Sequence, residues 1–182
     1  TNTTISVTGG AGNDTITTAA VLATGASVDA GAGTGDKLIV NTAAHLTSVT
    51  GAYYKNFEIL QNGSGASLDL STISGITSLV TSADASGFTK MNATQAAAIT
   101  VTAALTGATY ALADATGTAD VLALTAKSST ATTAVNLAGL TVDGFETLNV
   151  TESSGSTTLG SGGSIGFTSA ANLKTITLGG AY

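Results

Sequence analysis

The sequence contains no cysteine, no proline, no tryptophan and no arginine. Without cysteine, the chain has neither disulfide bonds nor the thiolate ligands of a zinc module. Its basic side chains are five lysines spread along 182 residues. No cluster of them is available to neutralise a phosphate backbone, so we expect no binding to nucleic acid.

Charge and long apolar runs are scarce as well. Charged residues make up 9% of the chain and the net charge is −6, which suits a divalent cation and repels anionic membranes. No run approaches the roughly 20 apolar residues that cross a bilayer, so we expect no direct insertion into a membrane. The sequence opens at Thr1 without a recognisable signal peptide, and we expect it to be a segment of a longer polypeptide.

Threonine, alanine, glycine and serine dominate, yet 43% of the residues are hydrophobic, which argues against disorder. This composition favours short β-strands joined by tight turns. The stretch Asn92–Ala104 is rich in alanine and then in β-branched residues, so helix and strand both remain open there. The expected strands include Thr3–Thr8, Lys37–Val40, Phe57–Leu60, Ser78–Thr81, Val121–Leu124, Thr147–Thr151 and Thr175–Leu178.

One short pattern recurs along the chain: a turn residue, an apolar residue, and then a strand with apolar residues at alternate positions. In each copy, the first apolar residue is expected to fill the interior at a corner. Such repetition is typical of solenoids, in which each coil buries its apolar face against its neighbours. We therefore predict an all-β fold, a right-handed parallel β-solenoid (a β-roll or β-helix). The copies lie at 56–60, 75–80, 144–150 and 172–178.

The sharpest motif is Gly9–Thr17, which matches the calcium-binding nonapeptide G-G-x-G-x-D-x-U-x at every specified position. Its glycines allow a turn that directs backbone carbonyl oxygens inward, and Asp14 adds a carboxylate. Calcium takes roughly six to eight such oxygen ligands. Gly10, Gly12 and Asp14 are therefore candidate positions for Ca²⁺ ligands.

One turn offers only part of a coordination sphere, so a second turn has to stack on it one coil away. The candidate is the segment 29–39, with Gly31, Gly33 and Asp36. One extra residue lies between its glycines and Asp36, which leaves a standard ligand geometry in question. We expect one ion between these two turns.

A third candidate turn, 114–122, keeps the terminal aspartate and the following strand but has lost most of its glycines. Asp114 and Asp120 are its candidate ligands. An ordinary turn is an equally good interpretation, because aspartate and glycine are common turn residues.

The nonapeptide, the two degenerate turns and the Gly-Phe-Glu-Thr-Leu-Asn-Val segment at 144–150 resemble the calcium-dependent surface-layer proteins of Gram-negative bacteria, which carry RTX-type nonapeptide repeats. The resemblance implies secretion by a type I system, folding in extracellular calcium and self-association into a lattice. A longer internal repeat, in which 35–40 is followed by 56–60 and 119–124 by 144–148, predicts an RTX-like calcium-binding module at 1–90 and a second related module at 91–182. Contact with cell-surface polysaccharide would come from other parts of the parent protein.

Catalytic groups are sparse. Glu58 and Glu146 follow corner aromatics at equivalent repeat positions, so we interpret them as residues of a solvated corner and not as a hydrolytic pair. His45 is the single histidine and is expected in a surface loop, while Lys55 beside two tyrosines is expected to serve packing more than sugar binding. We therefore predict no enzymatic activity.

Together these patterns predict a structural, calcium-binding segment of a secreted surface-layer protein at the bacterial cell surface, which self-associates into a lattice or filament. Two alternatives stay open: a module of a large RTX adhesin, and a non-catalytic domain of a secreted RTX enzyme.

Overall fold

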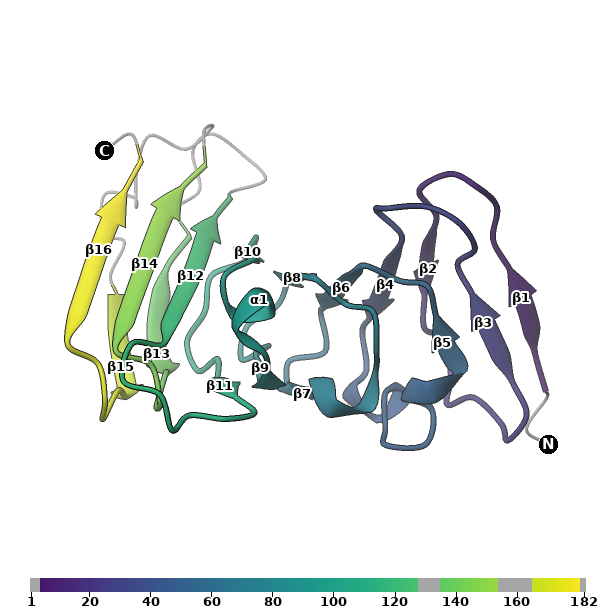
Figure 1. Ribbon diagram of the computed structural model, residues 1–182, viewed down its shortest axis with the longest axis horizontal. Helices are drawn as coiled ribbons and strands as arrows, with labels where there is room; N and C mark the ends of the chain where they lie inside the picture. Colours follow the sequence, from purple (N-terminus) through teal and green to yellow (C-terminus); the bar gives the residue numbers. More distant parts are fainter. Residues whose placement is uncertain (1–3, 128–134, 154–164, 181–182) are drawn as a thin grey trace.

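The computed structural model describes residues 4–127, 135–153 and 165–180. Every strand pairing given for these residues is parallel, and the chain winds into a stack of coils (Figure 1). The architecture is a parallel β-solenoid, which confirms the predicted fold class. The first expected strand was placed at Thr3–Thr8; Thr3 lies outside the described residues, and the strand itself spans Ser6–Thr8.

One long sheet runs the length of the stack. Within the described residues it has eight strands, and each strand between the two edges pairs with the strands of the coils before and after it. Leu38, for example, pairs with Leu60, and Leu60 pairs with Leu79. The strands are β2 (Thr15–Thr17), β4 (Lys37–Val40), β6 (Ile59–Asn62), β8 (Ser78–Thr81), β10 (Ile99–Val101), β12 (Val121–Ala126), β14 (Thr147–Glu152) and β16 (Thr175–Gly179).

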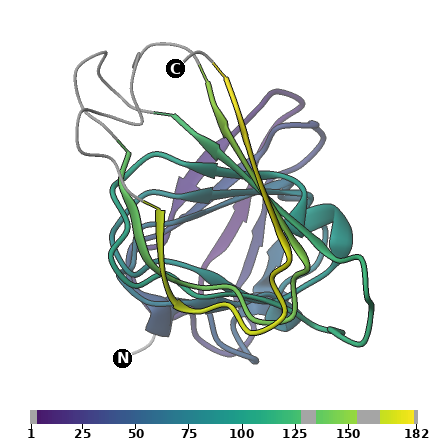
Figure 2. The same ribbon diagram turned by 90° about the vertical axis from the view of Figure 1, so that its left-hand side faces the viewer.

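Shorter strands complete each coil and form separate small sheets. Figure 2 looks along the stack from the β16 end and shows the coils superposed around a common interior. The first small sheet joins β1 (Ser6–Thr8), β3 (Ser27–Asp29) and β5 (Tyr54–Lys55); the second joins β7 (Leu68–Asp69), β9 (Phe88–Met91) and β11 (Tyr110–Leu112); the third joins β13 (Leu137–Thr141) and β15 (Ile165–Ser169).

Alternate residues of the long sheet fill the interior. In β4, Leu38 and Val40 are fully buried, whereas Lys37 and Ile39 are only half-buried. The alternation follows from the two-residue period of a strand. Burial of a leucine side chain contributes about 1.5–3 kcal/mol, and much of that burial is supplied by the next coil.

The corner residues that precede these strands behave as the repeat predicts. Phe57, Ile76 and Phe145 are 1%, 4% and 0% exposed, so each fills the interior at its corner. Leu173 occupies the same place in the last described coil and stays half-buried. Among the described residues no further coil packs on β16, which accounts for the difference.

The stretch left open at Asn92–Ala104 contains both structures. Its first part is the short helix α1 (Ala93–Ala96), and its second part is the strand β10. Asn92 and Gln95 form a reciprocal capping box that satisfies backbone groups at the start of the helix. Three short 3₁₀ helices also occur in the N-terminal half: η1 (Ala43–His45), η2 (Gly51–Tyr53) and η3 (Leu70–Thr72).

Two polar contacts cross the middle of the core. Asn62 is fully buried, and its amide donates to the carbonyl oxygens of Ala66 and Gly87 at 2.8 Å each. Thr81 and Tyr110, also fully buried, are joined through their hydroxyl groups at 2.9 Å. Because these polar groups are partnered, the usual cost of burying them is offset.

Candidate cation-binding turns

Acidic residues occupy the position immediately before several strands of the long sheet. Asp14, Asp36 and Glu58 precede β2, β4 and β6, and the strand register stacks them coil upon coil. We call these three residues the N-terminal ladder. Asp120 and Glu146 precede β12 and β14 in the same way and form the C-terminal ladder.

Hydrogen bonds connect the members of each ladder. The backbone N–H of Asp14 donates to Oδ1 of Asp36 at 2.6 Å, and that of Asp36 donates to Oε2 of Glu58 at 2.9 Å. In the C-terminal ladder, the N–H of Asp120 donates to Oε2 of Glu146 at 2.8 Å. Each of these carboxylates is therefore held by the backbone of the preceding coil, through a bond type that contributes about 1.5–3 kcal/mol.

One carboxylate oxygen of Asp36 has no hydrogen-bond partner among the described residues. The residue is 0% exposed, and the oxygen concerned is its buried Oδ2 atom. A β-carbon at Gly33 would lie 2.6 Å from this oxygen and 2.8 Å from the carbonyl oxygen of Gly12. Two oxygens from adjacent coils therefore lie close to the position that a side chain at residue 33 would occupy, which only glycine leaves free of overlap.

The two glycine turns stack as the sequence predicts. Gly9 donates its N–H to the carbonyl of Asp29 at 2.7 Å, and Ala32 donates to the carbonyl of Gly10 at 2.8 Å. Gly31 has a φ of +97°, and a side chain there would collide with the Gly10 carbonyl. Both the conformation and the close approach require glycine, so the second turn packs directly on the nonapeptide in spite of its extra residue.

This arrangement fits a calcium ion. An unpaired buried carboxylate oxygen is costly unless a cation compensates it, and calcium accepts carboxylate and carbonyl oxygens together. In the part of the chain that the structure describes, no group of three or more His, Cys, Asp or Glu side chains could hold a metal. The ligands would thus be Asp36, the carbonyl of Gly12, further turn carbonyls and water.

Asp14, the aspartate of the nonapeptide, is placed differently from Asp36. It is half-buried, and its Oδ2 atom accepts the N–H of Gly10 at 2.9 Å within its own turn. The turn therefore already uses one oxygen of this carboxylate. Asp36 also has one oxygen engaged, by the N–H of Asp14, but its other oxygen is buried and unpaired, which makes Asp36 the stronger candidate ligand.

The turn at 114–122 contains a similar unpaired carboxylate oxygen. Oδ2 of Asp120 is buried and has no hydrogen-bond partner among the described residues, and a β-carbon at Gly117 would overlap it. Asp114, the other candidate here, is exposed and accepts bonds from the N–H and hydroxyl of Thr116 at 3.0 and 2.7 Å. These bonds lower the pKa of Asp114 and engage it in its local turn.

The glutamates of both ladders were misjudged from the sequence. Their equivalent positions are confirmed, but the solvated corner is wrong for Glu146, which is 5% exposed, and Glu58 is half-buried. Each follows an aspartate of the preceding coil, by 22 residues for Glu58 and by 26 for Glu146. That spacing equals one coil, and it is the signal that would have identified them.

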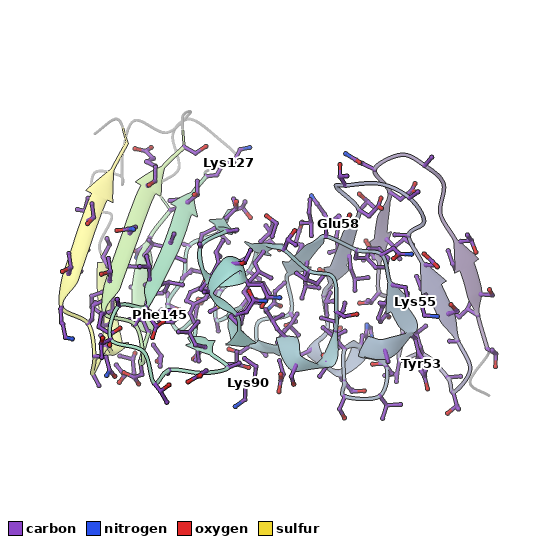
Figure 3. All side chains as sticks on the ribbon, viewed as in Figure 1. Tyr53, Lys55, Glu58, Lys90, Lys127 and Phe145 are labelled. Atoms are coloured by element: carbon purple, nitrogen blue, oxygen red, sulfur yellow. The ribbon has the colours of Figure 1, made fainter. Side chains whose placement is uncertain are left out.

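The groups considered for other chemistry are dispersed. His45 is half-buried, with Nδ1 3.1 Å from the hydroxyl of Thr18. Tyr54 is buried with its ring edge against Phe57, while Lys55 beside it is exposed, which agrees with a packing role for the tyrosine. Figure 3 shows the labelled lysines far apart on the molecule.

A hollow of about 390 Å³ lies at the N-terminal end of the stack. It is bordered mainly by apolar side chains and threonines of the first coils, including Ile5, Val7 and Val21, which are 43%, 37% and 46% exposed. Tyr54 is the one residue of its described lining with an ionisable side chain, so the hollow offers no carboxylate, imidazole or amine.

Among the described residues, no helix is long and apolar enough to span a membrane. Comparison with known proteins gives no relatives: no family model matches the chain, and neither the curated proteins nor the solved structures contain a significant match.

Proposed function

We propose that this chain is a structural, calcium-binding segment of a secreted bacterial surface-layer protein, without enzymatic activity of its own. The observation that supports it is the fully buried, unpaired Oδ2 of Asp36, which, like the Gly12 carbonyl oxygen, lies within 3.0 Å of the position that a β-carbon at Gly33 would take. The nonapeptide at Gly9–Thr17 lies in this same pair of turns.

The role of the ion follows from electrostatics. In the absence of a cation, folding buries the Asp36 carboxylate next to carbonyl dipoles of like sign, which is unfavourable. A cation that binds only the folded chain reverses this and stabilises it by RT ln(1 + [L]/Kd), about 2.7 kcal/mol at a hundredfold excess over Kd. Folding is then tied to a compartment rich in calcium, as expected for a protein exported to the cell surface.

The first experiment is a calcium titration of the whole chain, followed by far-UV circular dichroism and thermal unfolding, with a chelated sample as reference. We expect calcium to raise the melting temperature and the β-sheet signal. Asp36→Asn should remove most of that response, because the amide has no charge to hold the ion. An equal response in Asp36→Asn and the unaltered chain would contradict the proposal.

Asp69→Asn is the matched control, because it makes the same charge change at an exposed aspartate that is bonded to Ser71 in its own turn. It should leave the calcium response unchanged. Electron microscopy of the calcium-loaded protein then tests the assembly. An ordered two-dimensional array supports the surface-layer role, end-to-end fibres would favour a surface adhesin, and a persistent monomer would favour a domain of a secreted enzyme.

A further inference from the structure

We infer that the C-terminal half binds a second divalent cation at Asp120, in a turn that contains no nonapeptide. The inference rests on the proposed function, because it takes the buried, unpaired carboxylate of Asp36 as the mark of a cation site. It extends that function by making a different set of residues, Gly117, Asp120 and Glu146, the determinant of binding.

The first argument is that the turns at Asp36 and Asp120 share one geometry. In both, a glycine stands three residues before the aspartate, and Oδ2 of the aspartate folds back over that glycine. In both, this oxygen is buried and has no hydrogen-bond partner among the described residues. Gly33 and Gly117 therefore have the same function, which is to leave room beside an anionic oxygen.

The second argument is the residue one coil later. Glu58 and Glu146 both accept the backbone N–H of the aspartate that precedes them in their ladder, at 2.9 and 2.8 Å. This bond fixes the aspartate backbone and brings a second carboxylate next to the first. Glu146 is 5% exposed, and Asp120 is half-buried with its Oδ2 atom covered, so the two charges are only partly solvated and together attract a cation.

The surroundings indicate the class of ligand. A site with carboxylate oxygens and no nitrogen or sulfur donors selects a hard cation such as calcium. Residues 113–119 are exposed, so water is available to complete the coordination sphere. Around Gly117 the nearest atoms all belong to Asp120, whereas the Gly12 carbonyl is among those nearest to Gly33. The Asp120 site should therefore bind calcium more weakly than the Asp36 site.

The exposed aspartate of this turn provides an internal control. Asp114 has the same charge as Asp120 and lies in the same turn, but its carboxylate is engaged by Thr116. If general negative charge attracts the ion, both aspartates matter equally. If the buried oxygen binds it, only Asp120 matters.

The test is the amount of calcium bound per chain, measured by equilibrium dialysis and elemental analysis, with calcium as the probe. Asp120→Asn and Gly117→Ala should each lose one bound ion relative to the unaltered chain, and Asp114→Asn should lose none. Asp120→Asn should also melt at a higher temperature than the unaltered chain in chelator, because it removes an uncompensated buried charge. This second readout separates loss of the site from loss of the fold.

Each outcome decides a different claim. Unchanged binding in Asp120→Asn, or an equal loss in Asp114→Asn, would overturn the second site. If Asp36→Asn still loses an ion in that case, the proposed function stands. No calcium bound by the unaltered chain would refute both.

Discussion

The two ladders contain the same local arrangement in different surroundings. The N-terminal ladder has three carboxylates, and the glycine turn before Asp36 brings the Gly12 carbonyl close to it. The C-terminal ladder has two carboxylates, and the coil before Asp120 contains α1, whose Asn92–Gln95 capping box satisfies its own backbone groups. The comparison shows that an aspartate with a buried, unpaired oxygen arises within one coil, whereas the other oxygens near it depend on the neighbouring coil.

The largest expected effect tests whether the halves are equivalent in packing. Phe57 and Phe145 fill the same corner position directly before Glu58 and Glu146, and both are fully buried. Phe57→Ala and Phe145→Ala should each lower the free energy of unfolding by about 3–5 kcal/mol, because each leaves a cavity. Urea denaturation with saturating calcium measures this. A cost below about 1 kcal/mol in either half would show that its corner is not a core position.

The two glycines should differ in their tolerance of a side chain. Gly33→Ala places a methyl group against both Oδ2 of Asp36 and the Gly12 carbonyl, at a half-buried position where two turns meet. We expect a loss of about 1–3 kcal/mol, as for other overpacked interior sites. Gly117→Ala meets only the side chain of Asp120 in an exposed turn and should cost less than about 1 kcal/mol. The same denaturation experiment compares them, and an equal cost would contradict the difference in surroundings.

The ladder glutamates can be altered with little change in shape. Glu58→Gln and Glu146→Gln keep an oxygen that accepts the aspartate N–H but lose the charge. With calcium bound, each should lower the free energy of unfolding by about 0.5–1.5 kcal/mol, and more for Glu146 because it is more buried. In chelator the loss should vanish or reverse, since a like charge beside the aspartate is removed. A loss independent of calcium would mean that the glutamates serve only the backbone.

The smallest expected effect concerns acid pH. Hydrogen bonds from the side chain and backbone of Thr106 lower the pKa of Asp84, and bonds from Ala171 and Ser169 lower that of Asp143. Because the folded-state pKa is depressed, the stabilisation is present above the unfolded value of about 3.9 and is lost as pH falls through the folded value.

Both carboxylates are exposed, so solvent screening limits each effect to roughly 0.5 kcal/mol. Asp84→Asn and Asp143→Asn should therefore reduce the steepness of acid unfolding slightly and to a similar degree. Acid titrations followed by circular dichroism test this, and a large effect in one half alone would contradict it.

The long sheet was predictable from the sequence because its strands alternate in burial and follow turn residues. The ranges expected for Lys37–Val40 and Ser78–Thr81 are those of β4 and β8. Of the small sheets, only β1 corresponds to an expected strand, the one placed at Thr3–Thr8. β7 has two residues, Leu68 and Asp69, which is too short for any periodicity to register.

The stacking of the two glycine turns was predictable from the sequence, but the surroundings of their carboxylate oxygens were not. A repeat identifies which turns are neighbours, so Asp14 and Asp36 were assigned to adjacent coils. Whether a carboxylate faces solvent or a neighbouring coil depends on its rotamer and on the coil length, which is 22 residues at Glu58 and 26 at Glu146. For this reason the unpaired oxygens of Asp36 and Asp120 could not be anticipated.

The buried polar contacts in the middle of the stack have a consequence for how the coils find their partners. Columns of leucine are interchangeable, so apolar packing alone permits a coil to pair with the wrong neighbour. Asn62 reaches the Gly87 carbonyl of the next coil, and Thr81 reaches the hydroxyl of Tyr110. A coil that skipped or repeated a partner would leave these groups unsatisfied inside the core, at a cost of about 1–3 kcal/mol each. Together these contacts make the pairing of the central coils specific, because the native order of coils satisfies the buried polar groups and a shifted order does not.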